Sequence, residues 1–451
     1  MEKIHIYHTN DVHSHLDSWP RTRHFLQQQR AMHELHGEAC FVFDIGDFID
    51  RSNIFTEATL GKSSVPLLND AGYDAVTIGN NEGITLAKGA LDSLYDEAEF
   101  DIIVNNLKEP SGTMPAWAQE YHIYTLASGV KLGVVAATAP YPDYYDNLGW
   151  HIEDAFEALH RTIHTLKPQV DIIVCLSHLG IQADELLAQN EPDLTLIFGA
   201  HTHHVLMEGK RVNNALLTGG GKYGRYIGHS TITFDGGVCD VDTTLIDTRT
   251  LPAERGEHRE TAAQQQQGEQ LLDVEVFETT RFYNKEWYHY SKLSDFFAEA
   301  LLDFSKADCA FFNAGIFLTD MQKGPVTAFD IHKMLPHPIN ACLFELTGAQ
   351  LKQILTTIEA SHDEWPRKEL RGLGFRGNVV GKILTYDFKL KDGVVYVKGK
   401  VVQREETVKL VTLDMFTFGW FFPELKQLPK TYLLPQFLRD ILTIYGHKYF
   451  M

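Results

Sequence analysis

Short apolar runs alternate with longer segments of helical period through the first half of the chain. The apolar runs are rich in β-branched residues and predict strands at residues 4–7, 40–43, 75–78, 102–104, 131–137, 171–176 and 194–198. The segments between them carry apolar residues at helical spacing and predict helices at 21–35, 63–71, 86–97, 153–166 and 183–189. Strands separated by helices indicate βαβ units around a largely parallel sheet.

The pattern changes after residue 205. Alternating runs at 229–234 and 238–245, punctuated by glycines, predict antiparallel strands that close the first domain. Residues 250–268 are charged, rich in Gln and almost free of large apolar residues, which predicts a linker that is helical in part. We expect this linker to lead into a helix at about 270–280, followed by a second pattern that begins with a helix at 293–304.

The division of the chain follows from this change of pattern. We expect a first domain at 1–249, a linker with a connecting helix at 250–280, and a second domain at 281–451. A length of 451 residues with 44% apolar residues is sufficient for two hydrophobic cores.

Charge and targeting signals narrow the class of protein. The formal net charge of −20, from 40 basic and 60 acidic residues, disfavours binding to long nucleic acids but not to a small nucleotide held by metal ions. The first residues contain no basic and apolar signal pattern and no stretch is long enough to span a membrane, so we expect a cytoplasmic protein. The five cysteines are widely spaced and predict reduced thiols.

Side chains that bind metal ions follow five of the predicted strands. They are Asp11, His13, Asp47, Asn80, His178, His201 and His203. Because ligands of open α/β sheets bind at the carboxyl ends of the strands, these loops are expected to meet at one edge. Oxygen and imidazole donors without a thiolate suit Mn, Fe, Zn or Co, and their identity stays open.

The number of donors indicates two metal ions rather than one. Seven donors exceed a tetrahedral set, whereas two divalent ions roughly 3.5–4 Å apart and bridged by a carboxylate would use them all. Each short motif alone is more often a capping pair or a surface turn. An interpretation in which these residues bind no metal would require all seven donors to lie at strand ends by chance.

The order of these motifs resembles the calcineurin-like metallophosphoesterase superfamily. His8-Thr9-Asn10-Asp11-Val12-His13-Ser14-His15-Leu16 is similar to the opening of the 5′-nucleotidase family, which hydrolyses nucleotides and related phosphate esters. Segments 313–316, 325–327 and 346–352 are similar to the C-terminal specificity domain of that family. The resemblance implies an α/β fold, a four-layer sandwich, followed by an α+β domain.

The resemblance also implies a role for each ligand. Asp11, His13, Asp47 and His203 would bind the first ion, and Asp47, Asn80, His178 and His201 the second. Asp47 would therefore be shared between the ions. A hydroxide that bridges the two metals would be the nucleophile.

One catalytic position departs from the family pattern. The G-N-H-E motif of the family carries a catalytic His, and this chain has Asn81 there. An amide donates a hydrogen bond to a phosphoryl oxygen but delivers no proton at neutral pH, and general acid help is worth roughly 10²–10⁴-fold. His8, His15 and His204 are candidate replacements, although a supporting or surface role is favoured for each.

The predicted substrate pocket also departs from the family pattern. Asn313 begins a loop that ends in Phe317, where the family places an Arg. Phe375 and Phe416 stand near the positions of two aromatic residues that sandwich the base in the family, so Asn313, Phe375 and Phe416 are the predicted substrate-binding residues. Aromatic residues at 416–422 could equally belong to the core.

The sequence thus predicts a phosphoesterase that acts on a small phosphate ester, expected to be a nucleotide, with Asp47 and Asn81 as its catalytic residues. Two alternatives stay open. The chain could retain its metals and act as a nucleotide-binding or regulatory protein with little turnover, or it could cleave phosphodiesters, cyclic nucleotides or non-nucleotide phosphates. No partner beyond a small molecule is predicted, and the oligomeric state is open.

Overall fold

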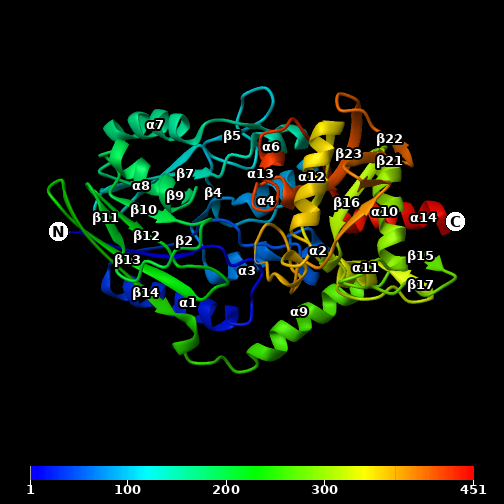
Figure 1. The fold of residues 1–451 in the computed structure, drawn as a ribbon. Helices are drawn as coiled ribbons and strands as arrows, with labels where there is room; N and C mark the ends of the chain where they lie inside the picture. The colour runs from blue at the N-terminus through cyan, green and yellow to red at the C-terminus, as the bar shows by residue number, and fades with distance from the viewer. Residues whose placement is uncertain (1, 371, 451) are drawn as a thin grey trace. The chain divides into compact units, whose positions relative to one another are not determined.

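A computed structural model describes residues 2–370 and 372–450 of the chain (Figure 1). It contains two compact units, Met1–Gly268 and Glu269–Met451. Among the described residues, no helix is both long enough and apolar enough to cross a lipid bilayer. All five cysteines are free thiols.

The first sheet of unit 1 begins at the N-terminus. Its six strands run in the order β14-β13-β1-β2-β3-β4. They are β1 (Glu2–Thr9), β2 (Ala39–Asp44), β3 (Ala75–Val76), β4 (Asp101–Ile102), β13 (Tyr226–Asp235) and β14 (Val238–Asp247). Strands β1 to β4 are parallel, while β13 and β14 add an antiparallel edge, as the alternating runs predict.

The second sheet of unit 1 has the order β11-β12-β10-β9-β7-β6. Its strands are β6 (Tyr121–Thr125), β7 (Lys131–Thr138), β9 (Ile172–His178), β10 (Leu196–Gly199), β11 (Lys210–Val212) and β12 (Ala215–Thr218). The four central strands are parallel and each outermost strand is antiparallel to its neighbour. The predicted, largely parallel sheet core is therefore confirmed, but as two sheets.

Helices lie outside the two sheets of unit 1 (Figure 1), and apolar side chains pack between the sheets. Ile6 and Phe43 of the first sheet share a core with Val174 and Phe198 of the second. Helices α1 (Trp19–His36) and α3 (Ser64–Ala71) belong to the first sheet, and α7 (Ala155–Leu166) and α8 (Ile181–Asn190) to the second. The helix–sheet–sheet–helix order confirms the expected four-layer sandwich.

Short elements complete unit 1. They are α2 (Ile54–Thr59), α4 (Asn80–Thr85), α5 (Lys88–Asp92), α6 (Pro142–Leu148), β5 (Leu107–Lys108) and β8 (His151–Ile152). Helix α5 covers only part of the helix predicted at 86–97, because the helix ends at Ser93.

The connection between the units differs from the prediction. The Gln-rich segment forms a helix, α9 (Glu257–Leu272). The helix expected through 270–280 is wrong after Leu272, because α9 ends there and β15 (Glu275–Thr279) follows. Strand β15 pairs with β17 (Gly324–Thr327) and buries Phe277 completely. Alternating β-branched and polar residues after Asp273 favour a strand once a partner strand is present.

Unit 2 mixes antiparallel strands with helices, which confirms the α+β class. Its main sheet has the order β19-β16-β23-β18-β24. These strands are β16 (Cys309–Asn313), β18 (Asn340–Thr347), β19 (Ile383–Tyr386), β23 (Thr407–Leu413) and β24 (Thr431–Phe437); β20 (Phe388–Lys391), β21 (Val394–Val397) and β22 (Lys400–Val401) form a smaller sheet. The helices are α10 (Lys292–Ser305), where a helix is predicted, α11 (Ala328–Met334), α12 (Gly348–Ala360), α13 (Pro423–Lys426) and α14 (Leu438–Phe450).

Candidate metal centre

The seven predicted metal ligands come from five strand ends in unit 1. Asp11 and His13 follow β1, Asp47 follows β2, Asn80 begins α4 after β3, His178 ends β9, and His201 and His203 follow β10. Parallel strands place these ends at one edge of each sheet. Contacts between the side chains link all seven into one cluster.

A first group of ligand atoms surrounds Nε2 of His13. This nitrogen lies 3.8 Å from Oδ1 of Asp11 and 3.4 Å from Nε2 of His203. Nε2 of His203 lies 3.4 Å from the same Asp11 oxygen, and Oδ2 of Asp47 lies 3.7 Å from Nε2 of His13. Two ligands on one tetrahedral ion are about 3.3 Å apart, so this spacing fits a divalent metal.

A second group lies on the other side of Asp47. Oδ2 of Asp47 is 3.5 Å from Nε2 of His178, and the His178 and His201 rings are 5.3 Å apart between centroids. Nδ1 of His201 lies 2.8 Å from Oδ1 of Asn80. The carboxylate of Asp47 therefore contacts ring nitrogens of both groups.

The backbone is strained at most of these ligands. Asp11, His13, Asp47, His201 and His203 have φ values of +48°, +50°, +53°, +71° and +58°. A non-glycine residue held in this region costs about 1–3 kcal/mol, and such residues concentrate at functional sites. The strain turns side chains from adjacent loops toward a common point.

Two glycines allow the loops to approach. Gly46 has a φ of +83°, and a Cβ atom there would lie 2.3 Å from the backbone nitrogen of Gly79. A Cβ atom on Gly79 would lie 2.1 Å from Oδ1 of Asp47. The motifs therefore require glycine beside Asp47 and Asn80 for steric reasons.

Opposite charges compensate within the cluster. Burial by itself would raise the pKa of Asp47, but the neighbouring His178 and His13 outweigh it and lower that pKa. Burial would lower the pKa of His178, and the carboxylate of Asp47 outweighs it and raises that pKa. Burial lowers the pKa of His201 to about 4, which leaves this imidazole neutral and able to bind a metal ion.

Supporting hydrogen bonds orient the ligands, and the sequence motifs did not identify them. Nδ1 of His178 donates to the carbonyl oxygen of Ile45 at 2.7 Å, and Nδ2 of Asn10 donates to Oδ2 of Asp11 at 2.7 Å. Glu82 is buried and accepts from the backbone nitrogens of Asp47, Ile49 and Gly79. Partners of this kind fix ligand orientation in metal sites.

Tyr141 also belongs to the cluster, and the sequence motifs did not identify it. Its hydroxyl lies 3.2 Å from Nε2 of His201, and burial raises its pKa to about 12. Tyr141 follows the end of β7, so the rule that selected the other residues could have found it.

The side-chain amide of Asn81 contacts other groups of the cluster. Its Nδ2 atom donates to the carbonyl oxygen of Ile49 at 2.8 Å and lies 2.8 Å from Nδ1 of His13. Its backbone nitrogen donates to Oδ1 of Asp47 at 2.7 Å. The side chain thus supports the His13 ring from the side opposite the ligand atoms.

The candidate proton donors have different surroundings. His8 is completely buried, burial lowers its pKa to about 3, and neither ring nitrogen has a hydrogen-bond partner among the described residues. His204 is exposed and contacts Thr202. His15 is exposed, and its ring lies beside that of Tyr223 with centroids 3.9 Å apart and planes tilted by 36°. It lines a pocket of about 300 Å³ together with His13 and Phe55. His15 is the only one of the three that lines this pocket.

The predicted substrate-binding residues lie in unit 2. Asn313 is buried and donates from Nδ2 to the carbonyl oxygen of Val380. Phe375 is 3% exposed and stacks on His337 at 5.2 Å. Phe416 is completely buried against Phe311 and further aromatic rings, so in this conformation it has no exposed face for stacking and has the surroundings of a core residue.

Comparisons with known proteins agree with this geometry. Residues 4–205 match the calcineurin-like phosphoesterase family, and residues 271–419 match the 5′-nucleotidase C-terminal domain. The chain is 39% identical over 456 residues to the uncharacterized metallophosphoesterase YunD of Bacillus subtilis, with 98% of each chain covered. It is 26% identical over 400 residues to the trifunctional nucleotide phosphoesterase YfkN of Bacillus subtilis, covering 78% of this chain and 27% of YfkN.

A solved structure shares the fold of the whole chain. The NAD nucleotidase of Haemophilus influenzae superimposes with a TM-score of 0.65 at 15% identity, covering 99% of this chain and 96% of that one. Calcineurin-like phosphoesterases generally bind two divalent metal ions, and the spacing of the ligand groups in unit 1 suits such ions. The chain therefore belongs to the calcineurin-like metallophosphoesterases that carry a 5′-nucleotidase C-terminal domain, and it is a metal-dependent hydrolase of phosphate esters.

Proposed function

We propose that this protein hydrolyses the phosphate ester of a nucleotide, or of a closely related small molecule, at a dinuclear metal centre. The position of the Asp47 carboxylate carries the proposal, since it lies 3.7 Å from a ring nitrogen of His13 and 3.5 Å from one of His178. A carboxylate between two groups of imidazoles is the arrangement that a bridged pair of cations needs.

The donor set fits such a pair. Asp11, His13, Asp47 and His203 would hold one ion, and Asp47, Asn80, His178 and His201 the other. When bound, a pair of divalent ions lowers the pKa of water and stabilises charge on a phosphoryl oxygen. The protein's part is to hold its ligands in one geometry by means of strained loops and the hydrogen bonds of Asn10, Ile45 and Asn81.

Asn81 bears on which esters would react well. Its amide supports His13 and supplies no proton to a departing alkoxide. Esters with good leaving groups should therefore react best, and this favours phosphodiesters with an activated alcohol as a second class of substrate. A protein that binds nucleotides with little turnover is the remaining alternative.

Metal analysis combined with a panel of mono- and diester substrates tests the proposal. We expect Asp47→Ala and His201→Ala to lose bound metal and to lose at least 10³-fold in kcat/KM, since a shared ligand or a direct ligand is removed. Asp96→Ala changes a carboxylate that is 65% exposed and serves as the matched control. Hydrolysis that persists in metal-depleted Asp47→Ala protein would contradict the mechanism, and bound metal without turnover on any ester would identify a binding protein.

A further inference from the structure

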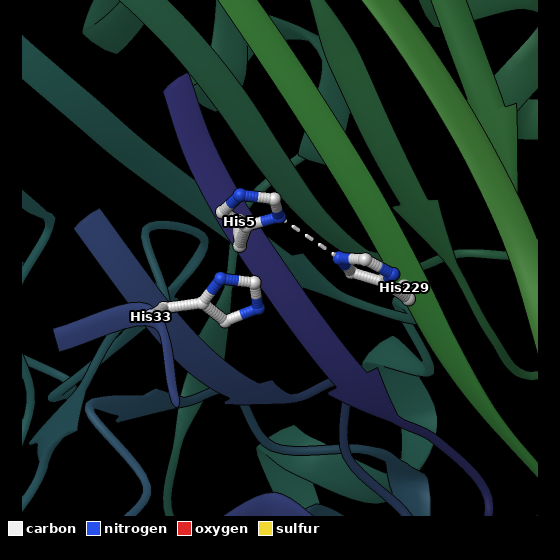
Figure 2. A group of neighbouring side chains, drawn as sticks. All are labelled: His5, His33 and His229. Carbon is white, nitrogen blue, oxygen red and sulfur yellow. Dashed lines mark hydrogen bonds between the residues drawn. The ribbon is translucent and has the colours of Figure 1, made fainter. Parts of the chain in front are cut away.

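A second group of histidines lies in unit 1, away from the candidate metal centre. His5 is near the start of β1, His229 is on the neighbouring strand β13, and His33 is in the last turn of α1. Figure 2 shows the three rings converging from these elements. The two groups share no residue, and β1 continues from His5 to Thr9 before the loop that carries Asp11.

The strand register explains why these side chains meet. Tyr7 is directly opposite His229 in the antiparallel pair of β1 and β13, so His5 and His229 are diagonal neighbours on one face. Helix α1 covers that face and brings in His33, which is 4% exposed. Three distant segments of the sequence therefore build the group.

The distances within the group suit a metal ion. Nδ1 of His5 lies 3.1 Å from Nε2 of His229, close to the separation of about 3.3 Å between two nitrogen ligands of a tetrahedral ion. One ligand atom from each of His5, His33 and His229 lies within 4.8 Å of the others. The rings of His5 and His33 are stacked with centroids 3.7 Å apart, so one of the two has to turn before both can direct a nitrogen at the same ion.

A carboxylate supports two of the rings. Oε2 of Glu38 lies 3.3 Å from Nε2 of His5 and 3.3 Å from Nδ1 of His33. A carboxylate that accepts from one nitrogen of an imidazole orients the ring so that the other nitrogen can bind a metal. The other nitrogen of His33, Nε2, lies 3.0 Å from the hydroxyl of Tyr7, so a metal ion would replace that contact. Glu38 is 30% exposed, so an ion can reach the group from solvent.

We propose that His5, His33 and His229 form an additional site for one Zn²⁺ ion, separate from the catalytic centre. Three imidazoles match the preference of zinc for nitrogen ligands, and the fourth position is left for water. Burial lowers the pKa of His229 to about 4, and it lowers the pKa of His5 as well, so these two rings are in the neutral form that binds metals. The bound ion fastens the end of α1 to the β1–β13 pair.

Zinc content of the full chain tests this site. The protein is stripped with a chelator, reloaded with Zn²⁺, desalted and analysed for zinc per chain. We expect His229→Gln and His33→Gln to hold one zinc ion fewer than the wild type while hydrolysing phosphate esters at an unchanged rate. His36→Gln removes an exposed histidine of the same helix and should hold as much zinc as the wild type.

Equal zinc content in all four proteins would overturn the proposal. If neither His229→Gln nor His33→Gln folds, zinc-edge anomalous diffraction from crystals of the wild type tests whether the site binds zinc. A peak about 2.1 Å from ring nitrogens of His5, His33 and His229 supports the site, and peaks confined to the catalytic ligands refute it. The result does not depend on which ester the catalytic centre hydrolyses.

Discussion

At the residue scale, the contacts of Asn81 connect it to two of the predicted metal ligands. Its side-chain nitrogen lies between the Ile49 carbonyl oxygen and Nδ1 of His13, and its backbone nitrogen donates to Asp47. Asn81 thus brings to the centre a contact with a predicted ligand and no imidazole. The contact should affect metal affinity, and the lack of an imidazole should affect the rate with poor leaving groups.

The contact to His13 predicts a change in metal affinity. Asn81→Ala should weaken metal binding by about 10–100-fold, the usual effect of losing a group that orients a ligand. Hydrolysis should fall at limiting metal and recover largely at saturating metal, as measured by activity across a metal titration. Asn147→Ala, at an exposed position of α6, is the control. Unchanged affinity would mean that Asn81 does not orient His13.

Because Asn81 carries an amide and no imidazole, we predict that the rate of hydrolysis depends steeply on the leaving group. Across a series of aryl and alkyl phosphates, kcat/KM should rise strongly as the pKa of the leaving alcohol falls, because no residue at position 81 delivers a proton. A shallow dependence would show that another donor acts. His15→Gln would then identify it, since His15 lines the pocket beside His13.

At the element scale, close approach between loops determines the geometry of the centre. The turn after β2 contacts the turn after β3 at Gly46 and Gly79, where no side chain fits. The Gln-rich helix α9 is attached to α1 by the pairs Arg21–Glu257 and Arg23–Glu260. Ion pairs and a glycine contact at Gly268, rather than apolar side chains, hold this helix in place.

Steric crowding at Gly46 predicts a large loss of stability. Gly46→Ala should cost about 1–2 kcal/mol for its positive φ and about 1–3 kcal/mol more for its contact with the Gly79 backbone. Gly112→Ala is matched, since Gly112 has a φ of +84° but no atom within 4 Å of the added Cβ, and should show only the first cost. Urea unfolding measures both. Equal losses would refute the role of the contact.

At the scale of the whole molecule, the buried carboxyl group of Asp184 connects stability to pH. Asp184 lies on α8, is 2% exposed, and accepts a hydrogen bond from Ser177 of β9. Burial raises its pKa to about 7. The folded state therefore holds a proton that the unfolded state releases near pH 4.

This difference predicts that stability falls as pH rises. Between about pH 4 and pH 7 the folded state binds more protons, so the free energy of unfolding decreases and then levels off above pH 7. Asp184→Asn removes the titrating group and should be more stable than the wild type at pH 8, by on the order of 2–4 kcal/mol, with little difference near pH 4. Urea unfolding at both pH values measures this, and a difference independent of pH would contradict it.

The sequence by itself determined the parallel strands and the candidate ligands that follow them, because periodicity and strand-end position are local properties of the chain. Only the tertiary structure decided which groups meet across long separations. It placed Phe416 in an aromatic core, turned Asn81 toward His13, made a strand of residues 275–279, and assembled His5, His33 and His229. Burial and contact depend on partners that local patterns do not encode.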